Sequence, residues 1–338
     1  MTAGVTSVPA APSRAAGMPG AADLLPLIER VPALAAPCRH HRDEAVIELA
    51  VQEWALRSFP ELYPARLRAA RFGEMASRAF PETKTPEVIL FGQWLVWLFV
   101  FDDLRDDGPL GWDEGAVDRL YDAVLSSCDT MPPLDAHPVV RAFRDLWART
   151  APRSGASWRA MFRVHLAEHR AACRYEARFR SARRLPSPSE YAHLRRQANG
   201  SFLFDLPEPV LGAELPGDLR TSAAWRELLS ACNDITAWCN DIASAAKESA
   251  HGDVHNYVLV LAHDRGVSLA AAADEVLDRI AGRIDDLTAA ARALPAEFTR
   301  LELSKAAARD ASKVAMVLLG APRGHLEWLL ESARYARP

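Results

Sequence analysis

The chain of 338 residues contains little glycine, little cysteine and no long uninterrupted apolar run. Glycine supplies 17 residues, and β-branched residues are sparse beside abundant Ala, Leu, Arg and Glu, which disfavours an all-β fold and favours helices. The five cysteines are widely spaced and form no Cys-x-x-Cys pair, so we expect reduced thiols in a cytoplasmic protein. The longest apolar segment, residues 88–101, is shorter than the roughly 20 residues that span a bilayer, so we expect no stable membrane insertion.

An excess of charge of either sign is also missing. The 40 Lys and Arg residues are balanced by 44 Asp and Glu residues, for a net charge of −4. This balance gives no overall basic surface of the kind that follows nucleic-acid phosphates, so we expect no nucleic-acid partner. The start of the chain has no basic segment followed by an apolar stretch, and we therefore expect no secretory signal.

Residues 1–23 consist almost entirely of Ala, Pro, Gly, Ser and Thr, a composition that predicts a disordered tail. Beyond it, apolar residues recur every three or four positions, and prolines separate the periodic segments. The pattern predicts helices over residues 42–58, 63–79, 86–106, 113–128, 137–151, 156–182, 188–200, 222–249, 253–265, 268–294, 297–319 and 322–335. We therefore expect a single all-α domain over residues 24–338, and the sequence leaves the choice between monomer and homodimer open.

Four carboxylates end the most apolar of these helices, in the run Asp102-Asp103-x-x-Asp106-Asp107. Asp102 and Asp106 are i,i+4 neighbours near a helix C-terminus, where their mutual repulsion and the helix dipole are both unfavourable. A positive group must compensate, either Arg105 or a divalent cation such as Mg²⁺, which binds carboxylates together with water and phosphate oxygens. An exposed acidic helix end is the alternative interpretation of this segment.

A second polar cluster follows one face of the helix predicted over 222–249. Asn240, Ser244 and Glu248 are spaced four residues apart, so their side chains form one stripe, and Lys247 falls on the same face. An amide, a hydroxyl and a carboxylate oxygen can hold one Mg²⁺, while the ammonium group pairs with an anion bound to the same metal. The alternative is a solvated helix face.

In combination, these two clusters resemble the metal-binding motifs of the bacterial class I terpene synthases (terpene cyclases). The resemblance implies a helical bundle around a central apolar cavity, in which the two motifs lie on facing helices, bind three Mg²⁺ ions and trigger ionisation of a prenyl diphosphate. It implies Lys247 as a diphosphate contact. The metal ligands that it implies are Asp102, Asp103 and Asp106 from the first motif and Asn240, Ser244 and Glu248 from the second. Whether Asp106 or Asp107 contributes stays open.

The resemblance also extends to a diphosphate-sensing arginine, a linker residue and an effector residue at a helix break. Arg196, Asn199 and Gly200 match these three positions in order. Asn199 stands where the family usually has Asp, so its link to the arginine becomes a neutral hydrogen bond. Arg195 is a rival for the sensor role, although only Arg196 has the family's spacing to the break.

Near the end of the chain, Arg334-Tyr335 is similar to the family's terminal pair, in which both side chains donate to the diphosphate. The cation left after ionisation needs apolar and aromatic walls that exclude water. Phe99, one turn before the acidic motif, is the first candidate wall residue. Asn233, seven residues before the polar stripe, is predicted to face the cavity as a polar wall residue or a water-positioning residue. Weaker aromatic candidates are Phe91, Trp97, Trp238 and Trp328.

The expected reaction is therefore Mg²⁺-dependent conversion of a prenyl diphosphate, with farnesyl diphosphate first, to a cyclic or rearranged terpene. Geranyl or geranylgeranyl diphosphate as substrate, a chain-elongating prenyl diphosphate synthase and a non-enzymatic helical scaffold remain alternatives. His165-x-x-Glu168-His169 also matches an inverted zinc-protease motif, but no downstream acidic ligand stands out.

Overall fold

The structure, a computed structural model, describes residues 17–106, 109–251, 253 and 255–335. About 79% of the described residues are helical, and no strand occurs among them, which confirms the all-α prediction. The α-helices are α1 (Leu25–Arg30), α2 (Glu44–Ser58), α3 (Pro64–Ala70), α4 (Phe72–Ala79), α5 (Thr85–Asp106), α6 (Glu114–Ser126), α7 (Pro138–Thr150), α8 (Ala156–Ala182), α9 (Pro188–Ala198), α10 (Pro207–Leu211), α11 (Gly217–Thr221), α12 (Ala223–His251), α13 (Tyr257–Arg265), α14 (Leu269–Arg300) and α15 (Lys305–Glu331). The short 3-10 helices are η1 (Ala21–Leu24), η2 (Pro32–Leu34), η3 (Pro109–Trp112), η4 (Ala151–Arg153), η5 (Ser201–Asp205) and η6 (Ala333–Tyr335).

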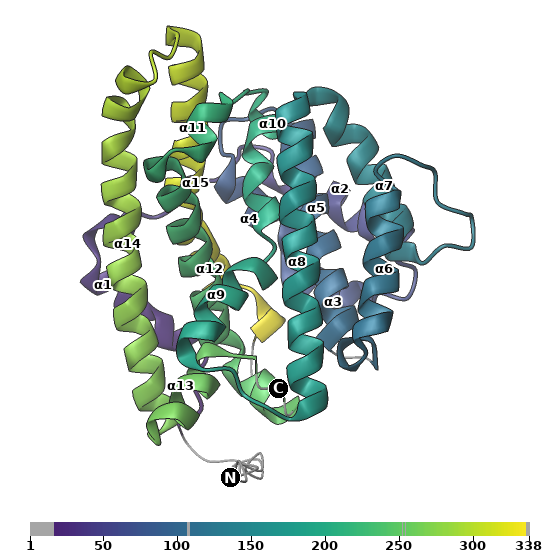
Figure 1. Cartoon of the computed structure of the whole chain (residues 1–338), viewed down its shortest axis with the longest axis vertical. Coiled ribbons are helices and arrows are strands. Elements are labelled where there is room, and N and C mark those ends of the chain that lie inside the picture. The colour runs from purple at the N-terminus through teal and green to yellow at the C-terminus, as the bar shows by residue number, and fades with distance from the viewer. Residues whose placement is uncertain (1–16, 107–108, 252, 254, 336–338) are drawn as a thin grey trace, which may run out of the picture.

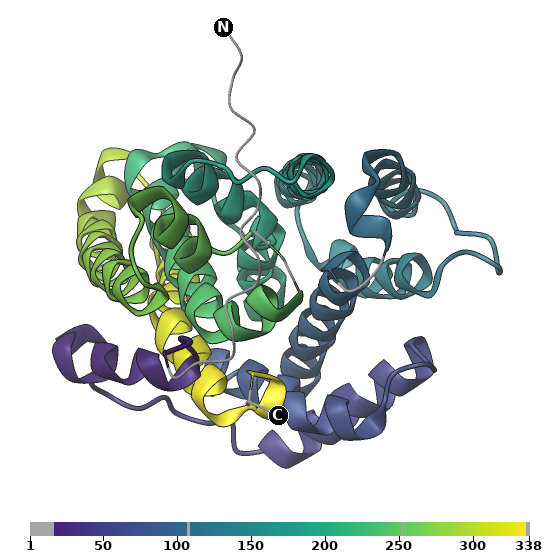
Figure 2. The ribbon, with the colours of Figure 1, turned by 90° about the horizontal axis from the view of Figure 1, so that it is seen from below.

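The long helices α5, α8, α12 and α15 form the inner part of the bundle, with α14 along one flank and α6 and α7 along the other (Figure 1). Seen from below, α5 lies between these two flanks, and η6 ends close to the lower end of α5 (Figure 2). Both motif helices, α5 and α12, therefore lie inside the bundle, and α12 packs lengthwise against α14 and α15.

Helix α5 is apolar on all sides because it is covered on all sides. Trp94 and Trp97 are fully buried, and their rings contact Phe143 of α7, with centroids 5.6 and 5.3 Å apart. The indole N–H groups donate to Thr150 Oγ1 and to the Val139 carbonyl. This aromatic packing fixes α5 at the centre of the bundle, so that the carboxylates at its end have a defined position.

Short helices also form in residues 21–34 and 201–221, where none was predicted, and the long helices are interrupted at other places than predicted. The segment 63–79 breaks at Arg71, which adopts φ 53° between α3 and α4. Pro295 lies inside α14 and Pro322 inside α15, whereas helix ends were predicted at both. The break falls instead before Ser304, whose side chain caps α15 by accepting from the Ala307 N–H. A proline removes one helical hydrogen bond, but burial of the apolar side chains around it can hold the helix together across that gap.

The predicted tail falls mostly outside the described residues, which begin at Gly17. Its last residues form part of η1, and Asp23 accepts a hydrogen bond from the Gly20 N–H at 2.7 Å. Leu24 is completely buried, and η1 packs against α12 and α15. The described part of the chain contains no helix that is long and apolar enough to cross a membrane.

Candidate active site

The acidic end of α5 meets the last turn of the described chain and the far end of α12. Arg334 of η6 forms a bidentate pair with Asp103, with Nη2 to Oδ1 at 2.7 Å and Nη1 to Oδ2 at 3.2 Å. Lys247 Nζ lies 3.9 Å from the same carboxylate. The Arg334 guanidinium also lies 4.6 Å from the centroid of the Phe99 ring, a cation–π arrangement. Three elements far apart in the sequence thus bring four predicted site residues together.

Asp102 is held from the opposite side. Arg105, one turn later, pairs with Asp102, and its other nitrogen donates to Glu176 Oε2 at 3.1 Å and to Cys173 Sγ at 2.8 Å on α8. Burial works to raise the pKa of Asp102, but the charge of Arg105, reinforced by Arg195, outweighs it and holds that pKa below its usual range. The acidic motif is therefore surrounded by arginine side chains, as the expected compensation requires.

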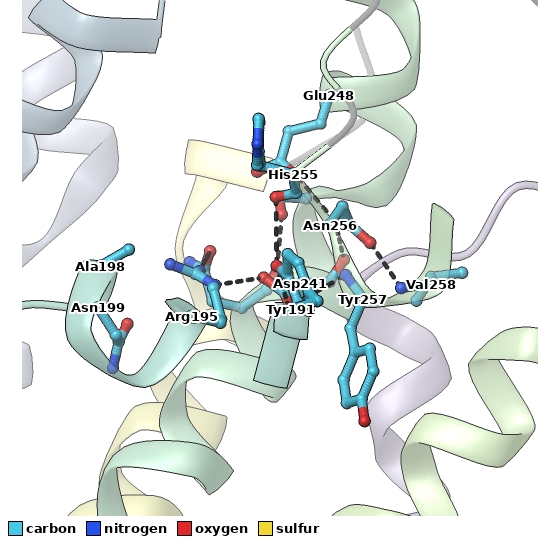
Figure 3. A network of polar contacts seen from close by, with 12 residues as sticks. Tyr191, Arg195, Ala198, Asn199, Asp241, Glu248, His255, Asn256, Tyr257 and Val258 are labelled. Atoms are coloured by element: carbon cyan, nitrogen blue, oxygen red, sulfur yellow. Dashed lines mark hydrogen bonds and ion pairs between the residues drawn. The ribbon is translucent and has the colours of Figure 1, made fainter. Parts of the chain in front are cut away.

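The polar stripe on α12 forms as the four-residue spacing predicts. Ser244 Oγ donates to the backbone carbonyl of Asn240 at 2.8 Å, and the Asn240 side-chain oxygen accepts from Arg195 Nη2 at 3.1 Å. Glu248 accepts from Asn256 Nδ2 at 2.7 Å (Figure 3). Burial first, and then the neighbouring carboxylate of Asp241, raises the pKa of Glu248 to about 8.

Arg195, the rival in the sequence prediction, lies on α9 and points toward Asp241 of α12 (Figure 3). Its Nε donates to Asp241 Oδ1 at 2.8 Å, and Tyr191, one turn earlier on α9, donates its hydroxyl to Asp241 Oδ2 at 2.8 Å. Burial works to lower the pKa of Arg195, but the charges of Asp241, Glu248 and Asp102 raise it well above its usual value. This arginine is a fixed cation that senses carboxylates of both motifs.

Arg196 points the other way. Its guanidinium forms a bidentate pair with Asp234, with both distances 2.7 Å, and Asp234 also accepts from Arg283 of α14. The Arg196 side chain is 38% exposed, against 14% for Arg195. Arg196 therefore does not face the site as expected. Successive residues of a helix are rotated by about 100°, so Arg196 points away from the direction in which Arg195 points. The buried Tyr191, four residues before Arg195, was the sequence signal for that phase.

The helix break after α9 occurs at the predicted position. Gly200 adopts φ 79° and ψ 60°, and a Cβ there would lie 3.1 Å from Leu98 Cδ2 of α5, so the position favours glycine twice over. Asn199 does not link to Arg196. It donates to Asn233 Oδ1 at 2.8 Å and to Thr236 Oγ1 at 3.2 Å.

Asn233 holds this break in place. Its amide nitrogen donates to the Arg196 carbonyl at 2.8 Å and to Ser201 Oγ at 3.1 Å, on the two sides of the break. The residues that line the cavity include Asn199 and Thr236 at this point, and Asn233 is not among them. The predicted polar wall residue thus acts through its neighbour Asn199.

An apolar cavity of about 100 Å³ opens next to these residues, between α4, α5, α15 and η5. Phe99 lines it as predicted, and so does Phe91. Trp328 stands behind Phe99, with ring centroids 5.4 Å apart. Trp97 belongs to the aromatic core between α5 and α7. The lining residues are Met75, Ala79, Phe91, Leu95, Leu98, Phe99, Asn199, Leu203, Phe204, Pro207, Thr236, Val317, Leu318, Ala321, Gly324 and His325.

The two histidines of the zinc-protease motif lie within hydrogen-bonding distance of other protein groups. His165 Nδ1 lies 2.7 Å from Asp205 Oδ2, and His169 lies between the Tyr121 hydroxyl and the Ala198 carbonyl. No cluster of three His, Cys, Asp or Glu residues suited to a metal occurs among the described residues. The geometry thus argues against a zinc site at this motif.

The oxygen donors of the two motifs nevertheless fit a hard divalent cation that shares its coordination with a substrate. Glu248 is a buried carboxylate that accepts a hydrogen bond from the neutral amide of Asn256, and burial together with the carboxylates of Asp241 and Asp253 raises its pKa despite the charge of Arg195. A cation bound there would favour its ionised form. The side chains of Asp106 and Tyr335, and the whole of Asp107, lie outside what the structure describes.

Comparison with known proteins agrees with this arrangement. Residues 93–286 match the family model described as terpene synthase family 2, C-terminal metal binding. The chain belongs to the terpene synthases. It is 34% identical over 274 residues to (-)-delta-cadinene synthase of Streptomyces clavuligerus, covering 80% of this chain and 83% of that protein. Pristinol synthase of Streptomyces pristinaespiralis is 29% identical over 291 residues, or 84% of this chain and 78% of that protein.

Solved structures show the same fold for the terpene synthase described here. A single-residue variant of cucumene synthase superposes with a TM-score of 0.78 at 26% identity, covering 89% of this chain and 98% of that one. Germacradien-4-ol synthase from Streptomyces citricolor gives a TM-score of 0.77 at 24% identity over 87% and 96% of the two chains, which bears on the fold alone. The chain is thus an enzyme of the lyase class with the helical fold of the class I terpene synthases.

Proposed function

We propose that this terpene synthase ionises farnesyl diphosphate in a Mg²⁺-dependent reaction and converts the allyl cation to a cyclic or rearranged terpene, with release of diphosphate. A bacterial relative from Roseiflexus castenholzii that is 33% identical over 214 residues carries the description (2E,6E)-farnesyl diphosphate cyclizing, which supports this choice of substrate. Geranyl and geranylgeranyl diphosphate are the alternatives to be tested beside it.

The observation that carries the proposal is that acidic and basic side chains from several helices form one polar site at the edge of an apolar cavity. Asp103 with Lys247 and Arg334, and Arg195 between Asn240 and Asp102, form one polar site, and Phe99 belongs both to this site and to the cavity wall. A ligand with a multiply charged head and an apolar tail fits such a boundary.

Ionisation places negative charge on the departing diphosphate. Three Mg²⁺ ions held by Asp102, Asp103, Asp106, Asn240, Ser244 and Glu248 would neutralise part of that charge. The chain's own donors do the rest: Lys247 and Arg334 from two elements, with Tyr335 beside the latter, donate hydrogen bonds to the leaving group. The side chains of Lys247 and Arg334 are both paired with Asp103, so the diphosphate competes with the Asp103 carboxylate for these two side chains.

We assign the anion-sensing role to Arg195 in place of Arg196. Its contact with Asn240 and the influence of Asp102 and Glu248 on its pKa support this assignment. Four residues later, Asn199 reaches the cavity, and Gly200 follows at the break. A shift of Arg195 toward a bound diphosphate would therefore also move Asn199 and Gly200 at the cavity wall, because both follow Arg195 at the end of α9.

The rest of the cavity excludes water from the cation. Leu95, Leu98 and Leu318 supply apolar surface, and the ring face of Phe99 attracts positive charge. Asn199, Thr236 and His325 are the polar exceptions. The Asn199 amide nitrogen and the Thr236 hydroxyl are engaged in hydrogen bonds with one another and with Asn233, whereas the buried His325 Nδ1 has no hydrogen-bond partner among the described residues.

The test is incubation of the purified protein with geranyl, farnesyl or geranylgeranyl diphosphate and Mg²⁺, followed by gas chromatography of the volatile products. We expect cyclic products from farnesyl diphosphate that disappear when the metal is removed with a chelator. Adding isopentenyl diphosphate tests for chain elongation. Absence of any Mg²⁺-dependent terpene from all three substrates would contradict the proposal, and so would unchanged activity in Asn240→Ala and Glu248→Ala.

A further inference from the structure

The apolar cavity extends from the polar site to a deep end between α4 and α15. Ring contacts give its direction: Phe72 of α4 meets Phe99 of α5 near the polar site, with centroids 4.9 Å apart, while Phe80 meets Phe91 at 4.8 Å. Helices α4 and α5 are therefore antiparallel. At 1.5 Å per residue, Phe91 lies about 12 Å along α5 from Phe99, away from the acidic motif.

Ala79 and Val317 lie at this deep end. Ala79, the last residue of α4, is followed by Phe80, which contacts Phe91 at this end. Val317 lies eleven residues before Trp328, or about 16 Å away along α15. Trp328 stands beside Phe99 at the polar end of the cavity. Since a diphosphate head binds at the polar site, the far end of a prenyl chain points toward these two side chains.

A groove of about 1150 Å³ lies on the other side of them. Ala79 and Val317 line both the groove and the cavity, whereas Leu318 lines the cavity alone and Met316 the groove alone. Their exposure agrees with this, because both shared residues are partly buried, while Leu318 is 1% exposed and Met316 is 66% exposed. At this point a single layer of side chains separates the two spaces.

The cavity has to gain space when a prenyl chain enters. Its volume of about 100 Å³ is well below the roughly 300–1,000 Å³ of pockets that enclose small-molecule ligands. Helix α15 is weakened beside the wall, because Pro322 cannot donate to the Leu318 carbonyl one turn before it. The groove side of the wall is apolar near this point, with Phe80, Val210 and Leu211 among its residues.

We propose that Ala79 and Val317 form the wall that limits the length of the prenyl chain, and that opening this wall admits a chain one isoprene unit longer into the groove. The wall is a specificity determinant of the reaction assigned above, and the inference rests on that proposed function. Ala79 and Val317 touch only the end of the hydrocarbon chain, far from the ionising bond, so their substitution changes which substrate fits and leaves the ionisation machinery intact.

The test compares kcat/KM for geranylgeranyl and farnesyl diphosphate in the full-length protein with Mg²⁺. Val317→Ala removes part of the wall. We expect it to raise the ratio of kcat/KM for geranylgeranyl diphosphate to kcat/KM for farnesyl diphosphate by about tenfold or more, since one or two methyl groups in an apolar pocket discriminate between substrates to this extent. Ala79→Leu thickens the wall from the opposite helix. We expect it to lower turnover of farnesyl diphosphate about tenfold relative to geranyl diphosphate.

Two neighbouring residues supply matched controls. Met316→Ala enlarges the groove without touching the cavity and is expected to keep the wild-type ratio. Leu318→Ala enlarges the cavity without opening the wall, so products change while the preference for chain length moves less than in Val317→Ala. An unchanged ratio in both Val317→Ala and Ala79→Leu, or an equal shift in Met316→Ala, overturns the proposal. If the wild type converts none of the three diphosphates, the proposed function itself fails, and the wall with it.

Discussion

The inner and outer faces of α9 carry adjacent arginines with opposite surroundings. Arg195 is enclosed between Asp241 and Asn240 at the meeting point of both motifs, whereas Arg196 is partly exposed and pairs with the buried Asp234 away from them. The same contrast recurs elsewhere, with Asp103–Arg334 inside the site and Asp129–Arg163 on the surface. Identical residue types thus have different roles according to the face on which they lie.

Replacement of the inner arginine is expected to have the largest effect. Arg195→Met leaves the buried Asp241 without its guanidinium partner, which costs about 3–5 kcal/mol of unfolding free energy. Loss of one positioned donor should also reduce kcat/KM with farnesyl diphosphate by about 100-fold or more. Urea unfolding and steady-state kinetics measure the two effects separately.

Arg196→Met is the matched control on the outer face. The buried Asp234 keeps its second partner, Arg283, so the loss of stability should be smaller than in Arg195→Met, about 1–3 kcal/mol. Because a destabilised Arg195→Met could lose activity by unfolding, Arg195→Lys keeps the charge beside Asp241 but not the forked contact. Activity lost in Arg196→Met and kept in Arg195→Lys would reverse the comparison.

The next effect concerns the two bidentate carboxylates. Asp103→Asn removes the charge that holds Arg334 and Lys247 at the site, and we expect turnover to fall about 10-fold to 100-fold. Unfolding free energy should change by less than about 1 kcal/mol, because the pair is partly exposed. Asp129→Asn breaks the outer pair with Arg163 and should leave kcat and the Mg²⁺ dependence of the rate unchanged. Equal losses in both variants would show that Asp103 acts only through stability.

A smaller effect separates two glycines with left-handed backbones. Gly200→Ala and Gly212→Ala each place a Cβ at positive φ, which costs about 1–2 kcal/mol of stability. The Gly212 position is open, but the new Cβ at Gly200 meets Leu98 beside the cavity. Only Gly200→Ala should therefore change the product distribution in gas chromatography. The same products from Gly200→Ala and the wild type would contradict a role for this break in shaping the cavity.

The smallest effect is a pH dependence of stability. Burial, and then the charge of Arg195, lowers the pKa of His325 to about 3, below the value near 6.5 of an unfolded histidine. As the pH falls below about 6.5, the unfolded chain takes up a proton that the folded chain does not, so stability declines by about 1 kcal/mol per pH unit. Urea unfolding between pH 7 and 5 should show a flatter slope in His325→Gln than in the wild type. His193→Gln, on the exposed side of α9, should leave the slope unchanged.

Much of the fold could be predicted from periodicity. The range of α8, residues 156–182, agrees with its prediction, because apolar spacing and flanking Pro and Gly residues act locally. The position of the break between α14 and α15 could not be predicted in this way. Pro295 and Pro322 are strong local signals for helix ends, but tertiary packing overrides them. The residues around Ser304 carry a cap whose effect depends on the neighbouring helices.

For the candidate site, the two polar clusters at residues 102–103 and 240–248 could be located from the sequence, because the residues of each cluster follow one another on a single helix. The distance to Gly200 could not show which of Arg195 and Arg196 lies beside the second motif, since the packing of Tyr191 against α12 decides which face of α9 is inside. Asn233 was placed on the correct helix but bonds across the break. Such contacts between elements leave no periodic trace in the sequence.

The most direct test of the site is the binding of inorganic diphosphate in the presence of Mg²⁺, measured by titration calorimetry on the wild type and on both arginine variants. It requires no turnover and no assumption about the substrate tail. We predict that the wild type and Arg196→Met bind diphosphate equally, while folded Arg195→Lys binds it at least about tenfold more weakly, or about 1.4 kcal/mol. Weaker binding by Arg196→Met together with unchanged binding by Arg195→Lys would contradict it.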